Sequence, residues 1–404
     1  MSRDRFQQRL LTSLNALQTA NQRRTRQLTE RPGPVSCRLF GRDFVSFATN
    51  DYLGLCHDPR VCLAFSQAAA DQAGSGASAL IAGRSVALCQ LEETLAEWEG
   101  TESSLVFPSG FSANIGTIMS LAGSRDAIFC DRDNHASLID GCRGSAAKFL
   151  VYDRTRLDQL RKSIARRRSE FDLVFIVTDT VFSMDGTLAD LNALCDLADE
   201  FDGLMIADEA HATGIFGQHG RGVCDAQGVE DRVSVRLGTL SKSIGSLGGF
   251  AAGSQALCDW LWNSARSQFF STALPPAVCA AATRSLQILR EEPERRYRLH
   301  ARATLMRRLL RESGVALMKV GEAEFAERLN PVESPIAGVL VGDDALAVQV
   351  SRQLQERGFL IPAIRPPTVP PKTARLRLSI SSEHTETQIE EAAEAISQVL
   401  ARVR

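Results

Sequence analysis

The sequence lacks a strong charge of either sign and any long apolar run. It contains 46 lysine and arginine residues against 48 aspartate and glutamate residues, which gives a formal net charge of −2. So balanced a charge produces no overall field that would attract nucleic acid or an anionic membrane surface. No apolar run reaches the ~18 residues that a transmembrane helix requires. We therefore expect neither nucleic acid nor a membrane as a partner.

Paired cysteine motifs are also absent. The ten cysteines are scattered without a CxxC pair or a regular spacing, and the sequence begins without a hydrophobic signal segment. This pattern favours free thiols in a reducing compartment over a disulfide framework. We expect a cytoplasmic protein and no metal site.

The sequence contains enough hydrophobic residues for a large core, because 44% of its 404 residues are hydrophobic and 23% are charged. Near the start, apolar residues recur at helical spacing, at Phe6, Leu10, Leu14 and Leu17. This spacing predicts an amphipathic helix that packs on the main body of the protein. We expect the Arg-Pro-Gly-Pro segment at 31–34 to end the helix and residues 44–47 to form a short strand.

From about residue 51 to 275, short apolar runs alternate with helical stretches, a pattern typical of parallel strands joined by crossover helices. The seven predicted strands cover residues 104–107, 127–130, 148–151, 173–178, 203–207, 234–238 and 249–252. We expect an α/β fold with one large, mainly parallel seven-stranded sheet and helices on both faces. Ligands of such sheets bind beyond the carboxyl ends of the strands.

The pattern changes near Pro275 to long helices rich in arginine and glutamate, followed by predicted strands at 336–341 and 375–380. This change indicates a smaller α+β lobe. We therefore expect three parts: an N-terminal helix and arm (1–50), a large α/β domain that binds the ligand (51–285) and a small C-terminal α+β domain (286–404).

Two polar motifs follow predicted strands. Asp208 comes directly after the strand at 203–207, with His211 three residues later, and Lys242 lies in a Ser/Thr/Gly-rich turn after the strand at 234–238. Taken singly, an acidic strand end commonly caps the next helix, and a Ser-Lys-Ser turn is commonly a surface loop. Together, an aspartate for a pyridine nitrogen and a lysine for an aldehyde are the two groups that pyridoxal 5′-phosphate (PLP) chemistry requires.

Two further elements suit the same cofactor. The run Ser109–Asn114 follows the strand at 104–107 and opens an apparent helix, whose free backbone amides suit a phosphate group. His135 follows the strand at 127–130, where its imidazole suits stacking on a cofactor ring. Glycine-rich turns often bind no phosphate and a lone histidine is usually structural, so both interpretations stay open.

In this order, the four elements resemble the α-oxoamine synthases, a family of PLP enzymes with the aminotransferase-type fold (fold type I). Members of this family condense an amino acid with an acyl-CoA thioester. The resemblance covers nearly the whole chain. It also includes the segments Asn50–Leu55, Phe182–Gly186, Gly220–Gly222, Ala363–Pro370 and Thr373–Leu378.

The resemblance implies roles for individual residues, with Lys242, Asp208 and His135 in catalysis. Lys242 would carry the cofactor as a Schiff base. The further cofactor contacts that it implies are Asp208 at the pyridine nitrogen, His211 at the ring hydroxyl, His135 over the ring, and Ser183, Thr239, Ser109 and the backbone of Gly110 and Phe111. The substrate contacts that it implies are Arg377 at the amino acid carboxylate, Asn50 nearby, and Thr368 and Arg24.

The resemblance also implies the substrates and the assembly. It favours L-alanine and a pimeloyl thioester, carried by coenzyme A or by a carrier protein, with release of carbon dioxide and the thiol carrier, as in biotin synthesis. Active sites of this fold usually lie at the interface of two subunits, so the resemblance implies a homodimer.

Three features depart from this pattern. The residues after Lys242, at 243–250, look more like those of a serine palmitoyltransferase; Asp179 stands where the family commonly has glutamate, and Cys89 where histidine is frequent. Another α-oxoamine synthase, using serine with a long acyl-CoA or glycine with a short one, is therefore the nearest alternative. More distant alternatives are an aminotransferase of the same fold and a non-catalytic structural or regulatory subunit, the latter disfavoured because the expected catalytic residues are intact.

Overall fold

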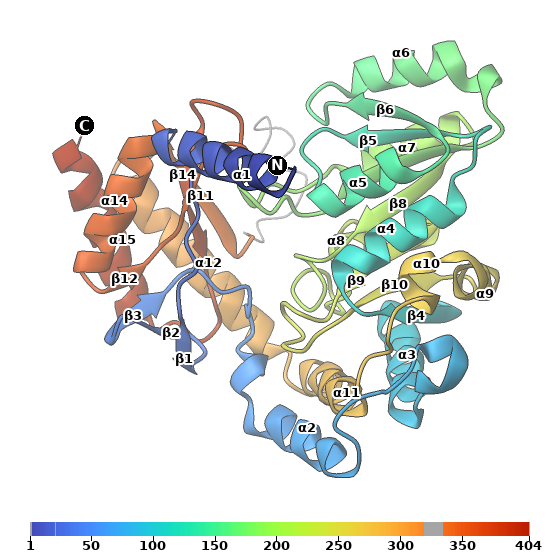
Figure 1. Ribbon diagram of the computed structural model, residues 1–404, viewed down its shortest axis with the longest axis horizontal. Helices are drawn as coiled ribbons and strands as arrows, with labels where there is room; N and C mark the ends of the chain where they lie inside the picture. The colour runs from blue at the N-terminus through green and yellow to red at the C-terminus, as the bar shows by residue number, and fades with distance from the viewer. Residues whose placement is uncertain (1, 21, 319–333, 404) are drawn as a thin grey trace.

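The computed structural model describes residues 2–20, 22–318 and 334–403 of the chain (Figure 1). The middle of the chain forms one lobe around a large sheet, and the C-terminal part forms a second lobe with strands from near the N-terminus. Helix α12 (Glu294–Glu312) leads from the first lobe into the second.

The first lobe is built on a seven-stranded sheet with the strand order β4-β10-β9-β8-β7-β5-β6. Its strands are β4 (Ser103–Phe107), β5 (Ala127–Asp131), β6 (Lys148–Tyr152), β7 (Val174–Asp179), β8 (Leu204–Asp208), β9 (Val235–Thr239) and β10 (Gly249–Gly253). All pairs are parallel except those of β10, which runs antiparallel to both neighbours. The seven predicted strands are confirmed, and each end lies within one residue of its expected place.

Helices cover both faces of this sheet because successive strand residues point to opposite sides. In β5, for example, Ile128 belongs to one buried cluster and Phe129 to another. One face packs against α4 (Gly110–Leu121), α5 (Ala136–Gly144), α9 (Gln255–Ser264) and α10 (Arg266–Phe269). The other packs against α3 (Val86–Glu99), α6 (Leu157–Arg167), α7 (Leu191–Glu200) and α11 (Pro276–Glu291), with α2 (Pro59–Asp71) against α11.

The second lobe contains two small sheets. The strands β11 (Ile336–Gly342), β14 (Ala374–Ser379) and β13 (Ala363–Ile364) form an antiparallel sheet, which confirms the strands predicted near 336–341 and 375–380. Its helices are α12, α14 (Asp344–Glu356) and α15 (Glu386–Val403). The other sheet joins β1 (Glu30–Gly33), β2 (Ser36–Leu39) and β3 (Arg42–Ser46) to β12 (Phe359–Leu360). The boundaries at 50 and 285 stay a prediction.

The N-terminal helix α1 (Ser2–Thr19) forms as predicted, but two expectations about it are wrong. It buries none of its residues, and Phe6 remains 58% exposed, so the helix does not pack on the main body. It also ends at Thr19 rather than near 31–34, where β1 lies instead. Between Leu17 and Leu28 the sequence has no large apolar residue, so further helical turns would have no face to bury.

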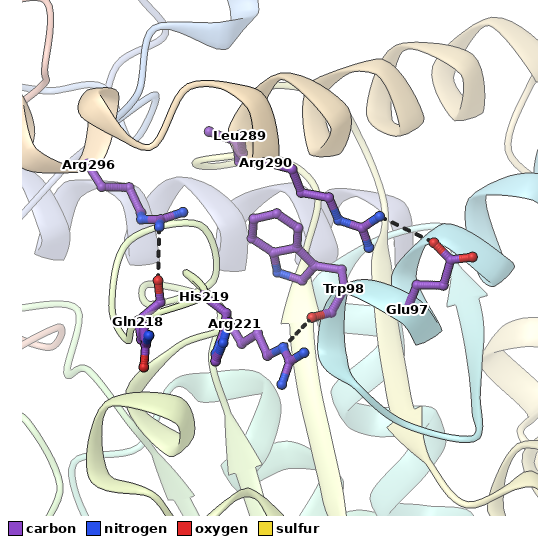
Figure 2. Close-up of a pocket in the computed structure, with 8 residues that line it drawn as sticks. All are labelled: Glu97, Trp98, Gln218, His219, Arg221, Leu289, Arg290 and Arg296. Carbon is purple, nitrogen blue, oxygen red and sulfur yellow. Dashed lines mark hydrogen bonds and ion pairs between the residues drawn. The ribbon is translucent and has the colours of Figure 1, made fainter.

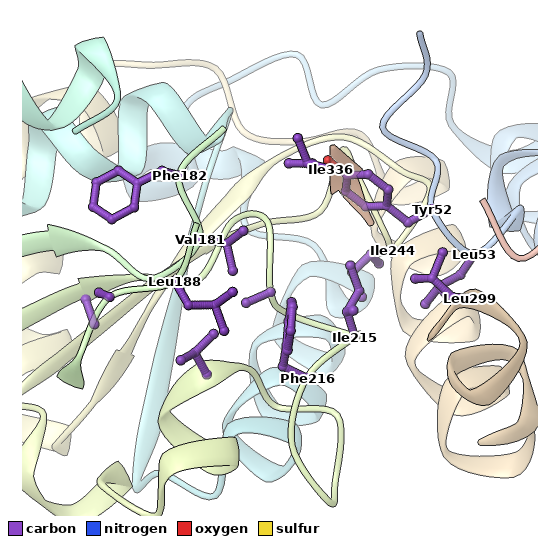
Figure 3. Close-up of a cluster of buried hydrophobic side chains, with 14 of the residues drawn as sticks. Tyr52, Leu53, Val181, Phe182, Leu188, Ile215, Phe216, Ile244, Leu299 and Ile336 are labelled. Atoms are coloured by element: carbon purple, nitrogen blue, oxygen red, sulfur yellow. The ribbon is translucent and has the colours of Figure 1, made fainter. Parts of the chain in front are cut away.

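A buried cluster joins the two lobes and the turns between them (Figure 3). Tyr52 and Leu53 come from the segment after β3, Ile244 from the turn after β9, Leu299 from α12 and Ile336 from β11. All five side chains are essentially inaccessible to solvent. Packing of this kind fixes the turn after β9 against the second lobe.

Candidate functional site

The predicted site residues follow the strands at one edge of the large sheet. Strands β4, β5, β7, β8 and β9 are mutually parallel, so their carboxyl ends share this edge. The expected residues that stand at or just after these ends are Ser109, His135, Ser183, Asp208 and Lys242. The topology therefore brings together residues that lie far apart in the sequence.

Asp208, the last residue of β8, is buried, with 3% of its surface exposed. Its Oδ2 accepts a hydrogen bond of 2.6 Å from Nδ2 of Asn114, and its Oδ1 accepts one of 2.8 Å from the amide of Ala210. The same Asn114 nitrogen donates to the hydroxyl of Ser137 at 2.8 Å. The carboxylate is thereby held in one orientation, and a carboxylate so placed can keep a neighbouring heteroaromatic nitrogen protonated.

Lys242 follows β9 in a turn closed by a hydrogen bond of 2.9 Å from the amide of Gly245 to the Lys242 carbonyl. Burial lowers the pKa of its amine to about 8, and the nearby charge of Arg377 acts in the same direction, while Asp208 and Asp179 oppose the shift. A lowered pKa makes the neutral amine, which is the nucleophile toward a carbonyl, more abundant near neutral pH. These surroundings distinguish the turn from a surface loop.

The two expected histidines lie in different surroundings. His211 is buried, and its Nδ1 lies 2.8 Å from the hydroxyl of Tyr52. Burial and the charges of Lys242 and Arg377 hold the pKa of His211 well below its usual range. Near neutral pH its ring is therefore uncharged.

His135 remains accessible to solvent, although the surrounding protein atoms lower its pKa. Its Nδ1 caps helix α5 by accepting a hydrogen bond of 3.3 Å from the amide of Ser137, and it lies 2.7 Å from the Ser137 hydroxyl. The Phe111 ring meets it edge-on, with 6.4 Å between ring centroids. The histidine thus has a structural role through one nitrogen and still presents its ring to the site.

The run beginning at Ser109 meets the ends of β9 and β10. The Ser109 hydroxyl caps α4 by accepting a hydrogen bond of 3.1 Å from the amide of Ser112. A Cβ added at Gly110 would lie 3.1 Å from the Thr239 side chain, and one added at Gly249 would lie 2.5 Å from the Cα of Gly110. The first amides of α4, including that of Phe111, therefore lie next to Thr239 at a helix N-terminus suited to a phosphate.

Arg377, on β14, connects the second lobe to this edge of the sheet. Its guanidinium donates to the Ser183 carbonyl at 2.5 Å, to the Ser379 hydroxyl at 2.8 Å and to Oδ1 of Asn50 at 3.1 Å. The same Asn50 oxygen accepts a hydrogen bond of 3.2 Å from the Tyr52 hydroxyl. A guanidinium has five N–H donors, so two remain for a ligand such as a carboxylate. Ser183 enters this network through its carbonyl.

Arg24 and Thr368 lie together but outside this network. The Arg24 guanidinium donates to the Thr368 hydroxyl at 3.3 Å, and both residues are exposed. In the residues that the structure describes, no hydrogen bond links this pair to Lys242 or Asp208. Their expected roles toward substrate stay a prediction.

The sequence alone assigned no role to Asn114 or Tyr52, although Asn114 lies in the run Ser109–Asn114 and Tyr52 in the segment Asn50–Leu55. Asn114 lies four residues after Gly110 on α4, so helical spacing places both residues on the same face of the helix. This spacing could have identified Asn114 from the sequence. The departure at Asp179 also lies at the site: Oδ2 of this residue accepts a hydrogen bond of 2.6 Å from the His135 amide, and burial raises its pKa well above the usual range. Cys89 lies half-buried on α3.

The chemistry of these groups fits PLP. Lys242 offers an amine of lowered pKa for the aldehyde, Asp208 a buried carboxylate for the pyridine nitrogen, and the start of α4 free amides for the phosphate. Across residues 2–20, 22–318 and 334–403, no three histidine, cysteine, aspartate or glutamate side chains are grouped as metal ligands. The ten cysteines are free. Of the described helices, none is long and apolar enough to cross a bilayer.

Comparisons with known proteins agree on one family. The sequence profile of the family "Aminotransferase class I and II" matches residues 42–396. The 8-amino-7-oxononanoate synthase of Saccharophagus degradans is 41% identical over 402 residues, which cover 98% of this chain and 97% of that protein. The synthase of the same name from Anaeromyxobacter dehalogenans is 42% identical over 369 residues, which cover 91% and 89%.

Two solved structures are similar as well. A serine palmitoyltransferase from S. paucimobilis with bound PLP and myriocin has a TM-score of 0.90 at 29% identity and covers 98% of this chain and 97% of its own. An 8-amino-7-oxononanoate synthase from Francisella tularensis has a TM-score of 0.74 at 27% identity, covering 89% and 98%. The expected aminotransferase-type fold is thus confirmed.

Proposed function

Because the chain belongs to the class I and II aminotransferase family, with 8-amino-7-oxononanoate synthases as its curated relatives, we propose that it joins L-alanine to a pimeloyl thioester. The products are 8-amino-7-oxononanoate, carbon dioxide and the free thiol carrier, coenzyme A or a carrier protein, in biotin synthesis. The observation that carries this proposal is the identity of 41% to a synthase of that name over 98% of the chain.

PLP is the cofactor of this family, and when bound it withdraws electrons from the Cα atom of an attached amino acid. Lys242 would attach the cofactor through its amine, and Asp208 would hold a proton at the pyridine nitrogen. His211 would contact the ring hydroxyl, and the exposed ring of His135 would contact the pyridine ring. The residues that would hold the phosphate are Ser109, Gly110, Phe111 and Thr239, and Ser183 would be a further contact of the cofactor.

The amine of Lys242 moves the proton at Cα. With a pKa of about 8, it can accept a proton from the substrate Cα and return it to the product without a large cost in either direction. Arg377 holds the alanine carboxylate with its two remaining N–H donors, and Asn50 orients Arg377. A fixed carboxylate keeps Cα within reach of Lys242. Arg24 and Thr368 would be further substrate contacts.

One observation favours a second candidate, a serine palmitoyltransferase activity. The structure from S. paucimobilis has the higher TM-score, 0.90 against 0.74 for the synthase from Francisella tularensis. The identity of 29% to the palmitoyltransferase, against 41% and 42% to the synthases, supports alanine and pimeloyl as the first choice. A high TM-score reports a common backbone fold, whereas substrate choice depends on individual side chains.

The proposal includes a cytoplasmic homodimer. Large apolar side chains remain exposed on a single chain around residues 80–81 and directly after α10, with Ile81 79% and Phe270 65% exposed. Helix α10 contacts the short helix at Ala79–Gly83, so these side chains belong to neighbouring segments. Exposed apolar groups of this size favour a partner surface. Light scattering at twice the chain mass of 44.0 kDa is the expected result.

Product analysis tests the reaction. The holoenzyme is incubated with L-alanine and pimeloyl-CoA and, in parallel, with serine and palmitoyl-CoA, glycine and acetyl-CoA, or alanine and a 2-oxo acid. Mass spectrometry should find 8-amino-7-oxononanoate with alanine and pimeloyl-CoA, and no product with Lys242→Ala. A faster reaction with serine and palmitoyl-CoA would assign the second candidate, and amino transfer to the 2-oxo acid without release of coenzyme A would assign an aminotransferase.

A further inference from the structure

A cleft lies beside the turn at 214–222 (Figure 2). It has a volume of about 490 Å³ and lies between the end of α3, the end of α11, the start of α12 and the turn at 214–222. The residues that line it are Glu97, Trp98, Gln218, His219, Arg221, Leu289, Arg290 and Arg296. None of these lining residues belongs to the group of residues around Lys242, so the proposed reaction does not explain the cleft.

Arg296 is a buried cation in this cleft, with 6% of its surface exposed. Its guanidinium donates to the Gln218 carbonyl at 3.2 Å, and burial lowers its pKa. Within the described part of the chain, no carboxylate forms an ion pair with it. A Cβ added at Gly220 would lie 2.5 Å from its Nη1, so the turn packs directly on the guanidinium and fixes its position. The charge of Asp225 acts on Arg296 without an ion-pair contact, so this buried cation is only partly compensated, which favours binding of an anion.

Trp98 supplies an independent sign of a missing acceptor. The residue is buried, with 3% of its surface exposed, and its indole N–H has no hydrogen-bond partner among the described residues. Arg290 covers the indole ring, with 5.9 Å between its central carbon and the ring centroid. Buried N–H groups are nearly always satisfied, so an unpaired one in the wall of a cleft indicates a place for an acceptor atom.

The arginine residues around the cleft are not fully balanced by carboxylates. Arg290 is paired with Glu97 at 3.2 Å. Arg221 and Arg236 share one carboxylate, that of Glu230, at 3.3 and 3.1 Å.

Arg236 also lies 3.4 Å from Glu99, but burial raises the pKa of Glu99 to about 8, so this acid carries little charge near pH 7. The carboxylate of Asp225 accepts hydrogen bonds from the amides of His219 and Arg221. Arg296 is therefore left with the weakest compensation of the arginines in the cleft.

We propose that this cleft binds a small oxyanion, a phosphate or carboxylate group, between Arg296, Arg221 and the indole N–H of Trp98. Guanidinium groups match the oxygen spacing of both anions, and a neutral N–H donor can hold a third oxygen. The site differs from the cofactor phosphate site in position and in donors, because the latter uses the amides of α4.

Calorimetry on the holoenzyme tests this site, because the cofactor then fills its own phosphate site. Inorganic phosphate and malonate are titrated separately at constant ionic strength, with saturating L-alanine present so that the carboxylate donors of Arg377 are already occupied. We expect saturable binding of one anion per chain at millimolar concentration or tighter. Stronger binding of phosphate identifies a phosphate group as the natural feature of the ligand, and stronger binding of malonate identifies a carboxylate.

Variants assign the binding to the cleft. Arg296→Gln should weaken it at least tenfold and Trp98→Phe, which keeps the ring and removes the N–H donor, about fivefold. Arg352→Gln, at an exposed position on α14, should bind as the wild type does. Absence of saturable binding of either anion, or unchanged binding in Trp98→Phe and a folded Arg296→Gln, would overturn the proposal. If Arg296→Gln does not fold, Trp98→Phe alone decides.

Discussion

The hydroxyl of Tyr52 lies 2.8 Å from Nδ1 of His211 and, through Asn50, connects this histidine to Arg377. The same hydroxyl donates to Oδ1 of Asn50, which also accepts from Arg377. Since the single phenol proton goes to Asn50, Nδ1 of His211 is the donor toward Tyr52. Nε2 is then left as the acceptor of the neutral ring. Burial raises the pKa of Tyr52 to about 12, so the phenol keeps its proton over the working pH range.

Tyr52→Phe breaks this chain at its centre. We expect kcat to fall and the KM for alanine to rise, each about fivefold to tenfold, because both His211 and Asn50 lose a hydrogen bond worth ~1 kcal/mol. The cofactor should remain bound with its normal absorbance. Steady-state kinetics measure the change, with Tyr297→Phe, at an exposed position on α12, as the matched control. Equal kinetics for the two variants would contradict the role of Tyr52.

Asn114 is a positioning residue for Asp208, since it ties this carboxylate to Ser137 and, through Ser137, to His135. Asn114→Ala should weaken cofactor binding and lower kcat by roughly tenfold to a hundredfold, because a hydrogen bond to a charged group contributes ~1.5–3 kcal/mol. The KM for the acyl thioester should not change.

The matched control for Asn114→Ala is Thr117→Val, a change of similar burial on the same helix. The Thr117 hydroxyl has no hydrogen-bond partner in the described residues. Cofactor affinity is measured by fluorescence titration of the apoprotein. If Asn114 had a purely structural role, Asn114→Ala would lower the thermal midpoint and leave cofactor affinity and kcat per folded protein the same as in Thr117→Val.

The strands and the charged residues at their ends could be predicted because both are local features of the sequence. An apolar run predicts a strand, and Asp208 and Lys242 come directly after such runs. The partners of these residues are not local. Asn114 reaches Asp208 because α4 packs on β9 and β10 and β8 is the next strand after β9 in the sheet, and a single sequence does not specify that strand order.

The error at the N-terminus has a related cause. Helical spacing predicts which face of α1 is apolar, and that part is confirmed by the helix itself. It does not predict what covers that face, and none of the residues of α1 is buried in the single chain. The same limit explains Arg377, whose contacts with Ser183 and Asn50 join three segments separated by more than a hundred residues.

The lowered pKa of Lys242 predicts how capture of the cofactor depends on pH. A pKa of about 8 instead of 10.5 leaves about one tenth of the amine neutral at pH 7, rather than about three parts in ten thousand. The rate at which apoprotein combines with PLP should therefore rise about tenfold per pH unit below pH 8 and level off above it. Absorbance stopped-flow between pH 6 and 9.5 measures this rate.

Two variants should move the pH midpoint of this rate in opposite directions. Asp208→Asn removes a negative charge that raises the pKa of Lys242, so the midpoint should fall. Arg377→Met removes a positive charge that lowers it, so the midpoint should rise. A midpoint near 10.5 in the wild type, or shifts of the same sign in both variants, would rule out this electrostatic account.

Arg377→Lys tests the two donors assigned to the substrate carboxylate. A lysine ammonium cannot offer two parallel N–H groups in the plane of a carboxylate. We expect the KM for alanine to rise about a hundredfold, while the affinity for PLP and the KM for the acyl thioester change little. Arg375→Lys, on the same strand with its side chain near Asp185, is the control. An unchanged KM for alanine in Arg377→Lys would remove Arg377 from the substrate site.

Gly249→Ala tests whether binding of the cofactor phosphate at the start of α4 depends on the close approach of the Gly249 and Gly110 backbones. Gly249 does not have the positive φ that favours glycine, so alanine is acceptable to its backbone conformation. The added Cβ would, however, lie 2.5 Å from the Cα of Gly110 and 2.6 Å from its nitrogen, and neither atom can move without shifting the start of α4. Overpacking of this kind costs ~1–3 kcal/mol.

We expect Gly249→Ala to weaken binding of PLP about tenfold or more, because the amides at the start of α4 lose their alignment with the phosphate. Gly74→Ala is the matched control, since a Cβ there meets nothing within 4 Å and the backbone again needs no positive φ. Titration of both apoproteins with PLP and with pyridoxal, which lacks the phosphate, separates the effects. Gly249→Ala should lose affinity for PLP and keep its affinity for pyridoxal, whereas an equal loss for both ligands would mean that the turn does not hold the phosphate.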